Sequence, residues 1–144
     1  MKRVIFLTLG CLGLIAFEGC KEKTPNRDYI PVIKQRVYLL QQAIKERSKV
    51  ALDSLLTDEY ASVSGADSVV QFSYGADPNF QFDRFGRTEI FYTDSRARVD
   101  GNIVGVDGRI LKEMTLTYEH RGERWLLKKI GPMLASPDSV DSLK

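Results

Sequence analysis

The sequence predicts an α+β domain in which N-terminal helices pack on one face of a curved antiparallel sheet. Apolar residues recur at helical spacing between residues 33 and 60, and from Arg87 onward the period of the pattern changes to two. Helices that precede a run of strands joined by short turns are typical of a meander whose second face meets water. These two observations define the expected architecture.

The first helix is expected near residue 30. Ile33, Val37, Leu40 and Ile44 follow one another at spacings of four, three and four, with polar residues between them. This spacing predicts an amphipathic helix that covers one face of the core. Pro31 suits its first turn.

A second helix is expected after a bend at residues 47–49, with Ser48 as its N-cap. Gly65 is expected to end this region, and Asp67 to cap a short third helical segment through Phe72. A strand fits that last segment equally well. The apolar side of the second helix comprises Leu52, Leu55, Leu56 and Tyr60.

Alternation of apolar and polar residues predicts the sheet. The dipeptide Asp107-Gly108 is a strong hairpin signal, a second tip is expected at residues 120–123, and Gly131-Pro132 should end the sheet. The expected strands cover residues 89–92, 96–103, 110–119 and 125–130.

The strand parity also predicts which side chains face inward. The expected inward row is apolar apart from Lys112 and Tyr118, and Asp100 falls on the opposite face. An acid or base held in a pocket is therefore not expected from these strands. The apolar members of the row are Ala97, Val99, Ile103, Ile110, Met114 and Leu116.

The arrangement resembles the nuclear transport factor 2-like fold, also called cystatin-like, over roughly residues 30–134. The segments that carry the resemblance are Ala43-Ile44-Lys45, residues 52–56 and the closing hairpin at residues 115–130. The resemblance implies helices that close a cone made by a bent sheet. It also implies that some members are isomerases, dehydratases or cyclases with an acid or a tyrosine inside the cavity. A cystatin-like inhibitor with one long helix is the nearest alternative.

Residues 1–19 have the pattern of an export signal. Lys2 and Arg3 give a positive start, and an apolar run over residues 4–17 leads to Gly19-Cys20. The run is shorter than the roughly 20 apolar residues that cross a bilayer. An uncleaved anchor and an ordinary secretory leader with an incidental cysteine are the alternatives.

The end of this leader resembles the lipobox of bacterial lipoproteins, in which a small residue precedes a cysteine that receives diacylglycerol. Phe17 and Glu18 depart from the usual pattern. The resemblance implies lipidation of Cys20 and attachment to a membrane. Lys21, in place of an aspartate, implies the outer membrane or the cell surface rather than the inner membrane.

The leader divides the chain into an expected signal peptide (1–19), a lipidated cysteine with a flexible tether (20–29), one domain (30–134) and a polar tail (135–144). Loss of Lys2, Arg3 and Glu18 from 21 basic and 19 acidic residues leaves 19 and 18. This near-neutral balance lacks the basic surface that nucleic-acid binding needs.

The sequence predicts no catalytic, cofactor-binding or metal-binding residues. His120, the one histidine, is expected at a solvated hairpin tip, and partners for a triad or a zinc site are not near it. The aromatic loop at residues 75–86 is expected either to lie over a cone mouth, to form a partner-binding edge, or to fill a satellite core. The candidate pocket or partner-binding residues are Tyr38, Phe80, Phe82, Phe85 and Tyr118.

Together these patterns predict a membrane-tethered lipoprotein of the cell envelope that binds a protein or a small apolar ligand and is not an enzyme. The alternative is a small-molecule-binding or isomerase-like enzyme that uses the cone cavity. A third interpretation is a structural spacer. A cavity enzyme requires an ionisable residue in a sizeable wet pocket, whereas an interaction domain requires a filled core.

Overall fold

The computed structural model describes residues 27–133, which form four helices and one four-stranded sheet. The predicted leader, Cys20 and the polar tail lie outside these residues. Within the described range, no helix combines the length and the hydropathy that a membrane span requires.

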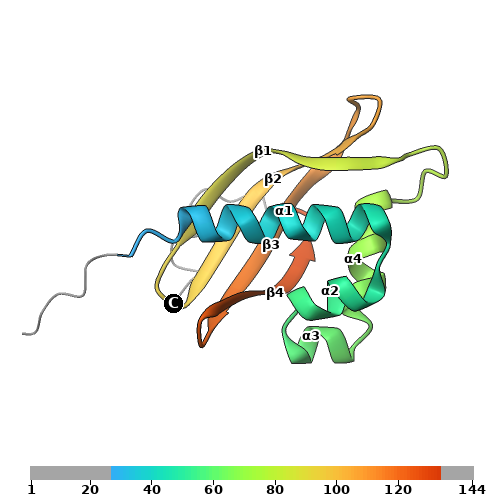
Figure 1. Cartoon of the computed structure of the whole chain (residues 1–144). Helices are drawn as coiled ribbons and strands as arrows, with labels where there is room; N and C mark the ends of the chain where they lie inside the picture. Colours follow the sequence, from blue (N-terminus) through green and yellow to red (C-terminus); the bar gives the residue numbers. More distant parts are fainter. Residues whose placement is uncertain (1–26, 134–144) are drawn as a thin grey trace, which may run out of the picture.

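The strands form an antiparallel meander in the order β1-β2-β3-β4, and the long helix α1 (Ile30–Glu46) lies across one face of it (Figure 1). The shorter helices α2, α3 and α4 gather at one end of the sheet. The predicted α+β class, with N-terminal helices on a curved antiparallel sheet, is confirmed.

Helix α1 forms as its pattern predicted. Pro31 lies in its first turn, and the helix ends where Arg47 adopts a left-handed conformation with φ 49°. The residues that it buries are Ile33, Val37, Leu40, Ala43 and Ile44.

The expected second helix is two short helices, so its predicted extent is wrong. Ser48 caps α2 (Lys49–Leu55) as predicted, accepting a hydrogen bond from the Ala51 N–H at 3.3 Å. The chain is then extended at Leu56, and the Thr57 N–H donates to the Leu127 carbonyl at 2.9 Å. This pairing with the sheet interrupts the helix, and Thr57 caps the next one, α3 (Asp58–Ser62).

Helix α4 (Gly65–Tyr74) confirms the helical alternative for this segment and excludes the strand. Gly65 begins this helix instead of ending the region before it, and Asp67 lies in the first turn and does not cap it. The glycine is required because a Cβ there would lie 2.4 Å from the Tyr60 carbonyl oxygen. Close packing of α3 on α4 therefore fixes the residue type.

The sheet consists of β1 (Phe82–Tyr92), β2 (Arg96–Gly105), β3 (Ile110–Arg121) and β4 (Arg124–Gly131). The first strand begins earlier than predicted, at residue 82 instead of 89. A shift in register between Gly86 and Glu89, with Arg87 at φ 48°, breaks the alternation and conceals the first half of the strand in the sequence.

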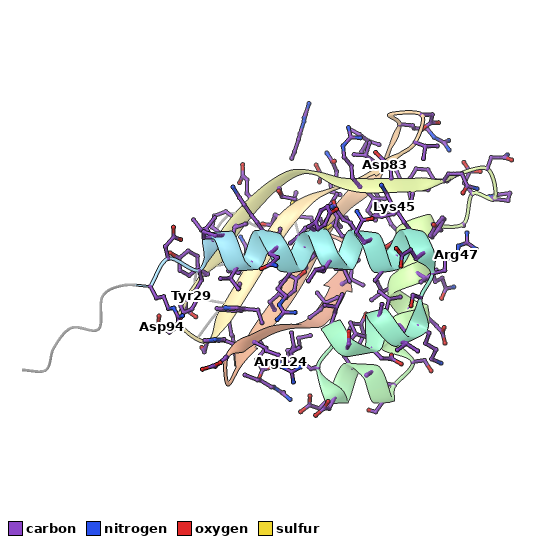
Figure 2. The ribbon with its side chains drawn as sticks, viewed as in Figure 1. Tyr29, Lys45, Arg47, Asp83, Asp94 and Arg124 are labelled. Atoms are coloured by element: carbon purple, nitrogen blue, oxygen red, sulfur yellow. The ribbon has the colours of Figure 1, made fainter. Side chains whose placement is uncertain are left out.

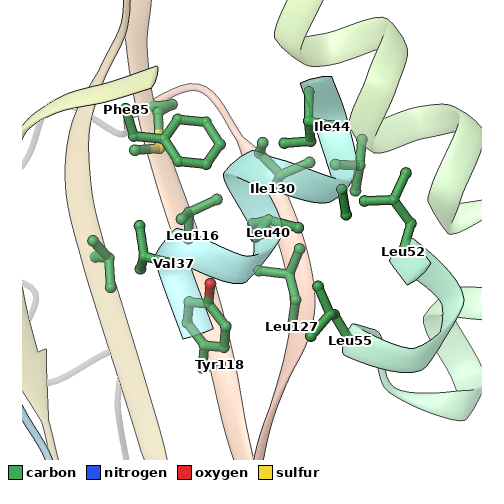
Figure 3. Packing of buried hydrophobic residues seen from close by; sticks show 14 of the residues in the cluster. Val37, Leu40, Ile44, Leu52, Leu55, Phe85, Leu116, Tyr118, Leu127 and Ile130 are labelled. Atoms are coloured by element: carbon green, nitrogen blue, oxygen red, sulfur yellow. The ribbon is translucent and has the colours of Figure 1, made fainter. Parts of the chain in front are cut away.

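The core fills the space between α1 and the concave face of the sheet (Figure 3). The predicted inward row is buried except for Ile110, which is 51% exposed, and Lys112, which is half-buried with its ammonium over the Phe72 ring. Ile110, the first residue of β3, pairs with Val104 on β2, and the register of the two strands shifts next to this pair. The shift changes which face of the sheet the Ile110 side chain takes. The rest of the row faces the core.

We predict that Leu40→Ala lowers the free energy of unfolding by about 2–5 kcal/mol, because Leu40 is 1% exposed and its removal leaves a cavity under α1. Leu39→Ala is the matched control, since the neighbouring leucine is 38% exposed and its loss should cost under about 1 kcal/mol. Urea unfolding of both variants measures the difference. Equal losses would contradict the described orientation of α1.

Candidate functional site

A hollow of about 200 Å³ lies between α1 and the edge strand β1. Two of the residues predicted from the sequence, Tyr38 and Phe85, lie in its wall. Tyr38 is 57% exposed, whereas Phe85 is buried. The full lining is Lys34, Val37, Tyr38 and Gln41 from α1 and Phe85, Thr88 and Ile90 from β1.

Two polar contacts join α1 to β1 beside the hollow. The side-chain carbonyl of Gln41 accepts a hydrogen bond from the Phe85 N–H at 2.7 Å. Lys45 pairs with Asp83 at 3.0 Å, and both residues are labelled in Figure 2. Hydrogen bonds from Lys45 and then from Arg84 lower the pKa of the Asp83 carboxyl, so it stays ionised at neutral pH. These contacts hold β1 to α1 beside the hollow.

Lys34 is the only charged residue in the lining of the hollow. No ion pair or hydrogen bond joins its side chain to another residue in the described range. The hollow therefore combines an apolar floor with one free positive charge at its wall. This arrangement favours a ligand that carries both an apolar and an anionic group.

Tyr118 does not line the hollow. It is 2% exposed and lies under α1 near Val37 and Leu40 (Figure 3). Its hydroxyl has no hydrogen-bond partner among the residues that the structure describes. Burial raises the pKa of this hydroxyl, so it stays neutral and serves mainly as packing area.

The predicted aromatic cluster fills the core. Phe80, Phe82 and Phe85 are 2%, 3% and 6% exposed, and the rings of Phe82 and Phe85 meet at 5.2 Å. The loop before β1 is held to the β2–β3 hairpin, because Arg109 pairs with Asp77 at 2.8 Å. The structure thus supports the satellite-core alternative over a lid, and only Phe85 reaches the hollow.

His120 lies within β3, so its predicted place at a solvated tip is wrong. Its ring stacks on Trp125 at 4.6 Å and contacts Tyr29 at 5.2 Å. Its Nδ1 lies 2.9 Å from the Asp94 carbonyl oxygen, and Figure 2 labels Tyr29 and Asp94 at this end of the molecule. The sequence signal for this contact is the hairpin register, which places His120 directly opposite Trp125 and so predicts that their rings meet.

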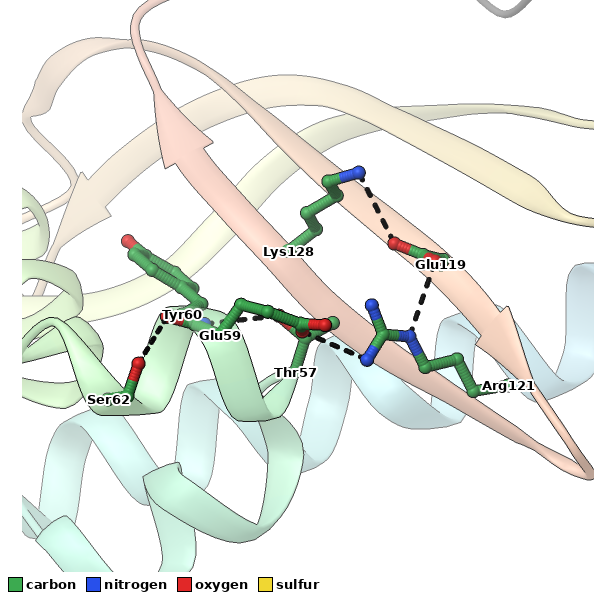
Figure 4. Close-up of polar contacts among 7 residues, drawn as sticks. All are labelled: Thr57, Glu59, Tyr60, Ser62, Glu119, Arg121 and Lys128. Atoms are coloured by element: carbon green, nitrogen blue, oxygen red, sulfur yellow. Dashed lines mark hydrogen bonds and ion pairs between the residues drawn. The ribbon is translucent and has the colours of Figure 1, made fainter.

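A network of charges ties α3 to the β3–β4 hairpin (Figure 4). Arg121 pairs with Glu59 at 2.9 Å and with Glu119 at 3.2 Å, and Lys128 adds a contact to Glu119 at 3.3 Å. Hydrogen bonds from Arg121 lower the pKa of both carboxyls. Since every charge here has a partner, the network is structural.

A metal centre has no basis in the described residues, which contain no cluster of three or more histidine, cysteine, aspartate or glutamate side chains able to hold an ion.

No protein-family model and no curated protein matches the chain. Solved structures are similar to it in the arrangement of helices and sheet. A chain whose name begins Rd1NTF2_05 has 15% identity and a TM-score of 0.48, with 72% of this chain and 97% of that chain covered.

Two further solved structures are similar. A SEC-C motif containing protein from Rhodopseudomonas palustris has 12% identity and a TM-score of 0.47, covering 64% of this chain and 71% of that one. An Ntf2 like protein involved in plasmid conjugation has 20% identity and a TM-score of 0.45, covering 75% of this chain and 41% of that one. Likeness at this level concerns the chain path and not an activity.

We predict that Tyr118→Phe leaves the free energy of unfolding unchanged or raises it by about 1 kcal/mol. The substitution keeps the ring and removes a buried hydroxyl that has no partner. Thermal and urea unfolding measure the effect. A loss above about 1.5 kcal/mol would show that the hydroxyl makes a hydrogen bond in solution.

Proposed function

We propose that the chain is a membrane-tethered, non-enzymatic binding domain of the bacterial cell envelope, and that the hollow between α1 and β1 is its binding site. One observation carries this proposal. The concave side of the sheet is filled by side chains, while an open hollow with a free lysine remains at its edge.

The size of the hollow favours a partner protein over a metabolite. Pockets for drug-sized ligands measure about 300–1,000 Å³. A hollow of about 200 Å³ has room for one or two anchoring side chains of a partner. The hollow supplies Tyr38 as an exposed aromatic contact.

The enzymatic alternative has less support. An isomerase-like mechanism needs a titratable group that touches substrate in a water-accessible pocket. Tyr118 is enclosed by the core, and the one charged residue of the hollow, Lys34, is exposed. Tyr118 is therefore out of reach of a substrate, and Lys34 faces solvent instead of an enclosed pocket.

The membrane tether rests on the leader that ends in Gly19-Cys20. Helix α1 begins at Ile30, so nine peptide steps separate Cys20 from Tyr29. At 3.3–3.6 Å per residue, this length of chain spans at most roughly 30 Å. The domain of a lipidated protein would therefore act close to the bilayer surface, on the outer membrane or the cell surface.

For the tether, we predict that protein expressed in a bacterial host loses residues 1–19, gains the mass of the attached lipid and enters the detergent phase. Cys20→Ser should abolish the lipid mass and the partitioning, because the sulfur that carries diacylglycerol is absent. Intact-mass measurement and detergent partitioning of both proteins test this. Identical behaviour of the two would overturn the lipid anchor.

For the hollow, we predict that a photo-crosslinking amino acid in place of Tyr38 forms a discrete adduct with a partner in the source organism. The matched control carries the same group in place of Val50, which is 82% exposed on α2 and distant from the hollow in sequence and fold. Gel analysis after irradiation compares the two positions. Absence of an adduct at position 38, or equal adducts at both positions, would contradict a binding site there.

A further inference from the structure

The two edges of the sheet differ in how they are covered. On β4, the Thr57 N–H bonds to the Leu127 carbonyl, and Leu56 forms a bridge with the same residue. On β1, the Phe85 N–H near the start of the strand donates a hydrogen bond to the side-chain carbonyl of Gln41. Within the described range, no hydrogen bond reaches the backbone groups on the outer edge of β1 between Thr88 and Tyr92, and the contact there is a side-chain one, from the Tyr92 hydroxyl to the Asp28 carboxylate at 3.5 Å. The second half of β1 is therefore the open edge.

The direction of the backbone groups on this edge follows from the β1–β2 turn. The Thr93 N–H donates to the Arg96 carbonyl at 2.8 Å, so these two residues form a hydrogen-bonded pair. Because such pairs alternate along an antiparallel ladder, Tyr92 and Ile90 belong to the pairs that are not hydrogen-bonded to β2. Their N–H and C=O groups point away from the sheet.

The side chains at the same positions face α1. Ile90 lies opposite Val99 and Tyr92 lies opposite Ala97, and both partners are 0% exposed on the concave face. Ile90 also lines the hollow. A strand added beside β1 would therefore direct the side chain opposite Ile90 toward the hollow.

The charge beside this edge selects the partner. Among the described residues Lys34 has no ion-pair partner, no acidic residue lines the hollow, and Arg87 is exposed at the start of the open edge. Glu89 is exposed on the same edge, but it lies opposite Asp100 and therefore faces away from the hollow. A carboxylate on the same face of an added strand would lie two residues from the side chain that enters the hollow, since alternate residues share a face. The surroundings thus complement an acidic segment.

We propose that the open edge of β1 and the hollow bind an extended peptide segment of a partner protein, which adds to the sheet as a fifth strand. An apolar side chain of the segment occupies the hollow, and an acidic residue two positions away pairs with Lys34. The proposal rests on the binding function proposed above and names the class of its partner. Strand addition of this kind combines main-chain hydrogen bonds with one or two side-chain pockets.

The bulge in β1 limits the length of such a segment. The ladder shifts between Gly86 and Glu89, and Arg87 has φ 48°, so a regular partner strand can run only along Glu89 to Tyr92. This four-residue edge suits a short recognition segment. It also restrains open-ended association of sheets, to which long free edges are prone.

The experiment uses the full chain carrying Cys20→Ser, so that no lipid is attached, and the peptide acetyl-Thr-Phe-Thr-Glu-Thr-Val-amide. We expect amide NMR shifts at Thr88, Ile90 and Tyr92, with slower hydrogen exchange at Ile90 and Tyr92 in the complex. Methylation of the peptide nitrogens that face β1 should abolish binding, because it removes the main-chain donors and leaves the side chains intact.

A charge exchange tests the role of Lys34. Lys34→Glu should weaken the glutamate peptide about two- to fivefold and strengthen a peptide with lysine in its place, as expected for an exposed ion pair. Lys129→Glu is the matched control, since Lys129 is exposed on β4 and the same charge change there should leave both affinities unaltered.

Three outcomes would overturn strand addition. The first is that millimolar peptide causes no amide shifts at β1, and the second is that the methylated peptide binds as well as the unmethylated one. The third is that free phenylacetate binds with the same dependence on Lys34, without slower hydrogen exchange at the Ile90 and Tyr92 amides. If peptides fail while the crosslinker at Tyr38 still forms an adduct, the binding function stands and only the strand proposal is wrong. If both fail, the proposed site itself is wrong.

Discussion

Packing of the apolar side of α1 against the concave face of the sheet is the contact on which the rest of the structure depends. Ile33, Leu40 and Ile44 are at most 1% exposed and meet an equally buried row on the strands. Each large apolar side chain buried in this way contributes about 1.5–3 kcal/mol. Since the outer faces of β1, β2 and β3 are exposed to solvent, the apolar layer between α1 and the sheet is the main source of stability for the sheet.

The same packing decides where function can reside. Leu116, Tyr118 and Leu127 are at most 2% exposed beneath the helix, so side chains fill this part of the interior. The Tyr118 hydroxyl there has no hydrogen-bond partner among the described residues. The helix runs beside β1 without burying its second half. The hollow that we propose as the binding site therefore lies at the edge of the sheet, where Lys34 is found.

Local periodicity was enough to predict the fold class, α1, the Ser48 cap and most of the inward row of β2 and β3. The errors occur where distant contacts override local pattern. The helix is interrupted before Thr57 because the Thr57 N–H bonds to the Leu127 carbonyl. Position 65 must be a glycine because a Cβ there would collide with the Tyr60 carbonyl oxygen. The bulge at Arg87 hid half of β1, and with it the hollow, of which only Tyr38 and Phe85 were predicted.

The proposed tether would suit a weak binding site at this edge. Tyr29, the last residue of the predicted tether, packs on the domain, with its ring 6.0 Å from that of Tyr92 and 5.3 Å from that of Trp125, beside the end of the open strand edge. A partner on the same membrane would then meet the edge at an effective concentration in the millimolar range. Under that condition a shallow hollow, one lysine and a short strand edge would need to supply only weak intrinsic affinity, which is what we propose for this site.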